Sequence, residues 1–270
     1  MREYLNTLGI EWLKLKYYRT FWILLGVVAV CIPAFNYVIY DITDNSFPKI
    51  NGQSLLGNPF SFPNVWSTVP YNAGILVFIP AILIITLFTN EYTFRTHRQN
   101  VIDGWSRSRF IHVKLTEVFI LSLFLTGIVI LTCLYFGFIT RKPMQPKAGW
   151  EQLRFILFYF IEMLDYSLIA VILSLLIRRA GLTMGIFFLY MIIEQFVVAL
   201  GRNKYKVTWV DYLPEEVSDR LIPQPFAKRI LTPGNNELWE KHVPLYLSIS
   251  VLYILLFIFF VSWRFRKADL

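Results

Sequence analysis

Six long apolar runs constrain this chain more than any other feature of its sequence. Each is close to the roughly 20 residues that an α-helix needs to cross a hydrocarbon layer of about 30 Å. A soluble core does not need uninterrupted apolar helices of this length. The sequence therefore predicts an all-α integral membrane protein with six transmembrane helices. The runs occupy residues 21–40, 73–89, 118–139, 155–177, 182–200 and 245–263.

Composition supports this interpretation and excludes the other membrane-spanning architecture. Apolar residues make up 56% of the chain and charged residues only 16%, whereas a soluble domain carries about 25% charged residues. The short alternating segments of a transmembrane β-barrel are absent. The first run follows a charged leader that includes Glu3 and Glu11, and no Ala-x-Ala-like site follows it. We therefore expect this run to remain as a span rather than to be cleaved as a signal peptide.

Lysine and arginine are distributed unevenly between the two sets of connecting segments, and this predicts the orientation. Short cytoplasmic loops carry the excess of these residues. We therefore expect both termini and the 90–114 segment to face the cytoplasm of a multi-pass protein in the plasma (inner) membrane. This topology accounts for the net charge of +8 without a nucleic-acid partner. The richer side holds Arg2, Lys14, Lys16, Arg19, the basic residues of 95–114, Arg178, Arg179, Arg264, Arg266 and Lys267; the short loops of the other side hold Lys49, Arg141, Lys142, Lys147 and Arg154.

The regions outside the spans predict further elements of a single transmembrane domain, 1–270. Residues 1–19 place Leu5, Leu8 and Trp12 on one helical face, which favours an interfacial helix on the inner leaflet. Residues 201–243 form the largest segment outside the spans. We interpret it as a large, water-exposed extracytoplasmic loop, part of which packs back on the membrane rim as short helices.

The segment between the second and third spans combines basic and aromatic side chains. Arginine and aromatic residues are favoured at the centres of protein interfaces. A helix is expected over about 93–102, a break near Gly104, and a second helix start with Ser106 as its cap. Basic residues alone are the default for a cytoplasmic loop. The hypothesis that this segment docks another protein therefore depends on the order of its residues.

That order resembles the coupling segment of ABC transporter permeases of the second exporter type, the ABC-2 type membrane protein family. The family shows a Glu at the end of the second span, then Thr-x-Arg, a Gly-x-Ser-Arg-like turn and a Lys at the start of the next span. Residues 11–22, with Glu11, Lys14, Leu15 and Lys16, also resemble the family's N-terminal interfacial helix. The matching residues of the segment are Glu91, Thr96, Arg98, Gly104, Ser106, Arg107 and Lys114, whereas Arg95 stands where the family commonly has a small residue.

The resemblance implies a half-transporter. Two six-span permeases, identical or different, would pair, and each would dock a cytoplasmic ABC ATPase through residues 90–114, a cytoplasmic coupling segment with a coupling helix. Most members of the family export their cargo. The chain has no Gly-Lys dipeptide, which a P-loop needs for binding phosphate. ATP and Mg would therefore be used by the partner, and the chain itself would carry no cofactor, metal or catalytic residue.

Three acidic residues lie within the predicted spans, where ionisable groups usually face a bundle interior or a wet cavity. Glu162 and Asp165 share a face of the fourth span, and Glu194 lies in the fifth. They are candidates for a polar patch on the export pathway or at the subunit interface. The interpretation that we favour is a hydrogen-bonded structural role.

Other functions are less consistent with the sequence. Glu215, Glu216 and Arg220 fit the Glu-Glu-x-x-x-Arg pattern of intramembrane prenyl-processing-type proteases, but they lie in a polar, Pro-rich segment, and we interpret the match as chance. His97 and His112 lack neighbouring ligands at metal spacing. A non-transport scaffold or sensor subunit, docking something other than an ATPase, remains the main alternative.

Overall fold

The described part of the chain is almost entirely helical, as the sequence predicts. A computed structural model describes residues 2–45, 49–50, 53–54, 59–94, 96, 106–140, 150–225 and 235–267. The α-helices are α1 (Arg2–Tyr17), α2 (Arg19–Asn45), α3 (Val65–Ile75), α4 (Phe78–Thr93), α6 (Arg107–Ile139), α7 (Arg154–Ile177), α8 (Ala180–Leu200), α9 (Pro214–Asp219) and α11 (Asn235–Lys267). Short helical turns are η1 (Trp150–Leu153), η2 (Gly201–Tyr205) and η3 (Trp209–Tyr212), and the two-residue strands β1 (Lys49–Ile50) and β2 (Gln53–Ser54) pair antiparallel.

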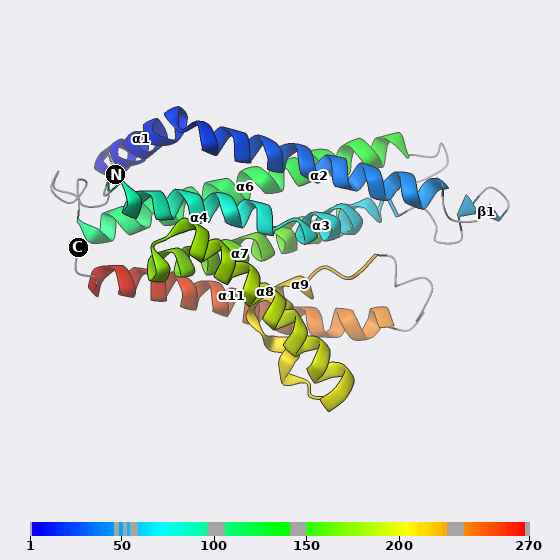
Figure 1. The fold of residues 1–270 in the computed structure, drawn as a ribbon. Helices are drawn as coiled ribbons and strands as arrows, with labels where there is room; N and C mark the ends of the chain where they lie inside the picture. The colour runs from blue at the N-terminus through cyan, green and yellow to red at the C-terminus, as the bar shows by residue number, and fades with distance from the viewer. Residues whose placement is uncertain are drawn as a thin grey trace.

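The described helices account for five to six membrane crossings. α2, α6, α7, α8 and α11 are each long and apolar enough to span a bilayer, and α3 with α4 passes the same test as a bent pair. Figure 1 shows these helices running roughly along one direction, with α8 inclined to the others and both termini at the same end of the bundle. The all-α, multi-span prediction is confirmed.

The second span is not the single helix that hydropathy predicts for 73–89. α3 and α4 meet at an angle of 50°. Pro80 offers no N–H to the carbonyl of Leu76, and its ring crowds that carbonyl, so a regular helix cannot continue through this point. The amides of Leu76 and Val77 bond three residues back instead. Pro33 and Pro244, which could kink their spans by the same argument, lie within α2 and α11 without ending them.

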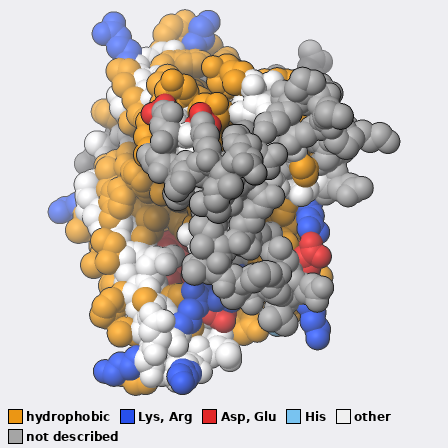
Figure 2. Space-filling view, turned by 90° about the vertical axis from the view of Figure 1, so that its right-hand side faces the viewer, with side chains coloured by type: hydrophobic (Ala, Val, Ile, Leu, Met, Phe, Trp, Pro, Cys, Tyr) orange, Lys and Arg blue, Asp and Glu red, His pale blue; other side chains and the backbone are white. Residues whose placement is uncertain are grey.

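α7 is the central helix of the bundle. In its most apolar stretch 67% of the residues are buried, against 17% in α2 and in α11. It packs against α3, α4, α6, α8, α9 and α11, and Tyr159 and Met163 are among its fully buried side chains. The peripheral helices instead expose large apolar residues. Exposed apolar residues are expected of a surface that faces lipid. Figure 2 views the end of the bundle opposite the termini and shows hydrophobic side chains at its edges.

The segment after α8 corrects one prediction. We expected residues 201–243 to be largely water-exposed, with short helices at the membrane rim. Short helices do form, but α9 packs between α7, α8 and α11. Val217 and Leu221 are fully buried there. This part of the segment therefore belongs to the interior of the bundle.

Candidate functional site

A group of buried charges lies at the end of the bundle that carries both termini. We call Glu11, Lys14, Glu91, Lys114 and Glu117 the basal cluster. Lys114 is at its centre, with a side chain that is only 4% exposed. Its Nζ lies 2.5 Å from Oε2 of Glu11, 2.8 Å from Oε1 of Glu91 and 3.1 Å from Oε2 of Glu117. Lys14 Nζ lies 2.6 Å from the other oxygen of Glu11.

The basal cluster joins three elements that are distant in sequence. Glu11 and Lys14 come from α1, Glu91 from the last turn of α4, and Lys114 with Glu117 from the start of α6. Burying a charge is costly unless oppositely charged partners and hydrogen bonds compensate it. Because one ammonium is shared by three carboxylates, none of the three elements can move away without leaving a buried charge unpaired.

The segment between α4 and α6 is attached to the bundle directly at this cluster. The Thr96 hydroxyl donates a hydrogen bond to a Glu91 carboxylate oxygen. At the other end of the segment, Ser106 is the N-cap of α6 and its Oγ accepts the Arg109 N–H at 3.2 Å. Ser106 therefore caps a helix as predicted. This helix begins at Arg107, well before the apolar run at 118–139.

The structure brings together only part of the residue set that the sequence motif predicts. Glu91, Thr96 and Lys114 meet in or beside the basal cluster. Arg98 and Gly104 lie outside the described residues, as does most of the helix expected over 93–102. Arg107 begins α6, but its side chain is not among those described.

Two aromatic contacts join other helices at the same end of the bundle. Phe110 of α6 stacks on Phe265 of α11, with ring centroids 5.1 Å apart. The guanidinium of Arg178, just after α7, lies 5.1 Å from the ring centroid of Tyr92 in α4. The chain turns sharply at Arg178, which has a left-handed φ of 59°.

Sequence reasoning missed Glu117 and did not predict the contact that Glu11 makes. Glu117 follows Lys114 by one helical turn, and this i, i+3 spacing was an available signal. Glu11 entered only through the resemblance of the N-terminal helix. Its contact with Lys114 spans 103 residues of sequence, and no local pattern indicates such a contact.

A second group of polar residues lies inside the bundle. Glu162, Asp165 and Glu194 are 4%, 0% and 5% exposed, so all three face the interior as predicted. Glu194 accepts hydrogen bonds from the backbone N–H groups of Glu215 and Glu216 at 2.7 and 2.9 Å. It thereby holds the first turn of α9 against α8. This supports the structural interpretation that we favoured for Glu194.

Asp165 and Glu215 differ from Glu194 because they are unpaired. Both are fully buried, and none of their carboxylate oxygens has a hydrogen-bond partner among the described residues. Burial, and then the nearby charges of Glu194 and Asp219, raise the pKa of Glu215 to about 9. Burial is also the main cause that raises the pKa of Asp219 to about 7. At neutral pH Glu215 is therefore a neutral carboxyl group.

An ion-pair network covers the outer side of α9. Arg220 binds Glu216 through Nε at 2.7 Å and Asp211 through Nη2 at 2.6 Å, and Arg202 pairs with the same two carboxylates. Arg220 also donates to the Tyr246 hydroxyl at 2.8 Å. We interpreted the Glu-Glu-x-x-x-Arg match as chance, and in the structure Glu216 is paired with two arginines in a packed element.

No group of three or more His, Cys, Asp or Glu side chains in the described part of the chain is arranged to hold a metal ion. His112 lies in α6, where its Nδ1 is 3.3 Å from the Ser108 hydroxyl at an exposed position. His97 lies outside the described residues. Cys133 is buried and Cys31 partly buried, and both are free thiols.

Comparisons with known proteins address the chain as a whole. The model of a family described as ABC-2 family transporter protein matches residues 7–194, well over half of the chain. This range includes most of α1, the basal cluster, the segment between α4 and α6, and Glu194. No curated protein matches the sequence.

Proposed function

The chain belongs to the ABC-2 family of transporter membrane proteins, and on that premise we propose that it is the permease subunit of an exporter driven by a separate cytoplasmic ATPase. The docking site in this proposal is the segment between α4 and α6. The residues assigned to it are Glu91, Thr96, Arg98, Gly104, Ser106, Arg107 and Lys114.

The basal cluster is the observation that carries this proposal. A docking segment can transmit force only if its ends are fixed to the helices that must move. Glu91 and Thr96 fix the end that leaves α4, and the Ser106 cap with Lys114 fixes the end that enters α6. α1 is held in the same assembly through Glu11.

The mechanism follows from this attachment. Closure of an ATPase pair on ATP would displace the docking segment along the bundle axis. The basal cluster would carry this displacement to α1, α4 and α6 together, because separating them exposes unpaired buried charge. The break between α3 and α4 gives the second span a point at which its two halves can change angle.

The assembly that we propose contains two permeases, identical or different, and two ATPases. The ATPases bind ATP and Mg and perform the hydrolysis, and the permease itself has no catalytic residues. Both termini and the docking segment face the cytoplasm of a plasma membrane. The excess of Lys and Arg at that end of the helices supports this orientation.

Co-purification tests the proposal directly. The tagged chain is isolated in mild detergent from its native membranes, and bound proteins are identified by mass spectrometry. We expect a Walker A-containing ATPase to be present with the wild type and lost from an Arg98→Glu, Arg107→Glu variant. The matched control is Lys204→Glu, Lys206→Glu, which reverses two charges after α8, away from the termini.

Each outcome of that experiment has a definite meaning. Loss of the ATPase from the docking variant alone supports the assignment, provided that both variants elute as folded proteins. Retention of the ATPase by the docking variant contradicts it. Absence of any ATPase from the wild-type complex favours the alternative, a scaffold or sensor subunit.

We assign Glu162, Asp165 and Glu194 to the interior structure rather than to the cargo pathway. Glu194 supports this assignment because its carboxylate accepts hydrogen bonds from the first backbone N–H groups of α9. Glu162 is packed closely against Gly74 of α3: a Cβ added at Gly74 would lie only 2.3 Å from Oε1 of Glu162. This close packing is consistent with a structural role for Glu162. Unimpaired transport by a Glu194→Gln variant would exclude a role for Glu194 in the cargo pathway. Loss of transport in a variant that stays stably folded would instead support such a role.

A further inference from the structure

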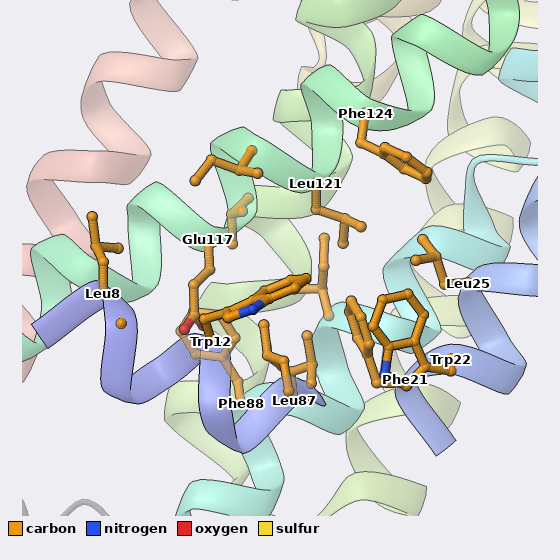
Figure 3. Close-up of a pocket in the computed structure, with 15 residues that line it drawn as sticks. Leu8, Trp12, Phe21, Trp22, Leu25, Leu87, Phe88, Glu117, Leu121 and Phe124 are labelled. Carbon is orange, nitrogen blue, oxygen red and sulfur yellow. The ribbon is translucent and has the colours of Figure 1, made fainter. Parts of the chain in front are cut away.

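A cavity of about 580 Å³ lies beneath the N-terminal helix, within the range of roughly 300–1,000 Å³ that is typical of small-molecule sites. It is bounded by α1, α2, α4 and α6, and Figure 3 shows the side chains that line it. Its lining is apolar apart from a single carboxylate, Glu117. The indoles of Trp12 and Trp22 meet edge to face at its rim, 6.2 Å apart, and both are about half exposed.

The polar and apolar parts of the cavity are separated along the bundle axis. Glu117 lies nearly three helical turns into α6, and Leu121 and Phe124 follow it on the same face toward the middle of the span. Phe21 and Leu25 run in the same direction along α2. Figure 3 shows Glu117 beside Trp12 at one end and Phe124 and Leu25 at the other. This polarity matches an amphiphile whose head lies at the level of α1 and whose tail points into the bilayer.

Glu117 supplies the chemical requirement for the head. Its Oε2 pairs with Lys114, but its Oε1 is buried and has no hydrogen-bond partner in the described part of the chain. A buried carboxylate oxygen without a donor is costly, and an ammonium donor satisfies it best because the hydrogen bond is charge-assisted. The indole face of Trp12 beside it also attracts cations.

We propose that this cavity binds one membrane phospholipid with a primary ammonium headgroup, taken from the same leaflet as α1. The ammonium donates to Oε1 of Glu117, and an acyl chain fills the space between α2 and α6. The lipid would thus complete the packing of α1 on the bundle, next to the basal cluster. The proposal concerns a lipid site and holds whether or not an ATPase docks at the neighbouring segment.

Glycine positions provide a matched pair of variants. Gly9 in α1 lines the cavity, and an added Cβ there meets nothing within 4 Å. Gly26 in α2 is equally open but does not line the cavity. Gly9→Leu therefore fills the cavity without a backbone clash, and Gly26→Leu makes the same chemical change elsewhere on the surface.

The test is native mass spectrometry of the full-length, delipidated protein titrated with phosphatidylethanolamine, phosphatidylcholine or phosphatidylglycerol of identical chains. We expect one phosphatidylethanolamine to bind about tenfold more tightly than the other two, because phosphatidylcholine lacks N–H donors and phosphatidylglycerol lacks the cation. Gly9→Leu should weaken this binding at least tenfold, and Gly26→Leu should leave it unchanged. Glu117→Gln should still bind lipid but lose the preference among headgroups.

Three results would overturn the proposal. Equal lipid binding by Gly9→Leu and Gly26→Leu would place the lipid elsewhere. An unchanged headgroup preference in Glu117→Gln would reject the assignment of the ammonium. If Gly9→Leu instead reduces the proportion of permease dimers without changing lipid binding, the cavity is a contact with a second copy.

Discussion

Lys114 is the residue on which the proposed mechanism most depends. Its ammonium is shared by Glu11, Glu91 and Glu117, and removing it leaves three carboxylates close together in a site with little water. We expect Lys114→Met to lower the free energy of unfolding by about 3 kcal/mol, which is typical of breaking a buried ion pair. Lys16→Met, which alters an exposed lysine of α1, is the control. Equal thermal unfolding midpoints for the two variants would show that the basal cluster does not stabilise the fold.

Glu215 gives the fold a dependence on pH. Its pKa is raised to about 9 in the folded protein, so the folded state binds this proton more tightly than the unfolded state, in which the pKa is about 4.3. The stabilisation is complete below the unfolded pKa and is lost as the pH rises through about 9, with a slope of at most about 1.4 kcal/mol per pH unit.

The corresponding variant is Glu215→Gln, which keeps the shape of the side chain but cannot ionise. We expect its unfolding midpoint to fall less steeply than that of the wild type between about pH 8 and pH 9.5, because Asp219, with a pKa of about 7, is already mostly ionised there. Glu240→Gln, at an exposed ion pair with Arg154, should retain the wild-type slope. A wild-type slope in Glu215→Gln would mean that Glu215 is not buried as a neutral acid.

Helix packing depends on particular glycines. At Gly137 of α6, an added Cβ would lie 2.4 Å from the Phe62 ring, which is itself buried, so the ring and the backbone would have to separate. We expect Gly137→Ala to destabilise the protein by roughly 1–3 kcal/mol, as overpacking does. Gly127 of the same helix has open space around it, and Gly127→Ala should stabilise by up to about 1 kcal/mol through helix propensity. Comparing the two unfolding midpoints checks the close contact, and a Gly137→Ala midpoint as high as that of Gly127→Ala would contradict it.

The elements differ in how far the sequence could predict them. Hydropathy identifies α2, α6, α7, α8 and α11 because each buries or exposes an apolar surface of bilayer length. It cannot separate α3 from α4, since the break depends on the backbone around Pro80 and not on polarity. α9 was not predictable as a buried element: its six residues carry no helical periodicity, and its position depends on the Glu194 carboxylate of another helix.

The residues of the candidate site also differ in how far the sequence could predict them. Glu91 and Lys114 were found because the motif places them at the two ends of one segment. Glu11 was named only through the resemblance of the N-terminal helix, and its contact with Lys114 was not predictable, because only the folded arrangement of α1 beside α6 brings the two residues together. The apolar residues that form the cavity beneath α1 are likewise unremarkable in sequence, and only their arrangement around Glu117 gives them a common role.

We expect the permease to act as a dimer that binds two ATPase subunits. With a chain mass of 31.8 kDa, the wild-type complex should contain two permease copies and two ATPase copies when its mass is determined by mass photometry or native mass spectrometry. If the second permease is a different chain, it should appear in equal amount. A stable, ATP-hydrolysing complex with one permease per ATPase pair would contradict the half-transporter arrangement.

The central claim is that the segment between α4 and α6 transmits the action of a separate ATPase to the helices through the basal cluster. A cryo-electron microscopy structure of the complex purified from native membranes tests it most directly. We predict an ATPase subunit seated against residues 95–105, with Lys114 still bound to Glu11 and Glu91. A structure in which that segment is bare or embedded in lipid, and in which any ATPase contacts another surface, would contradict the account.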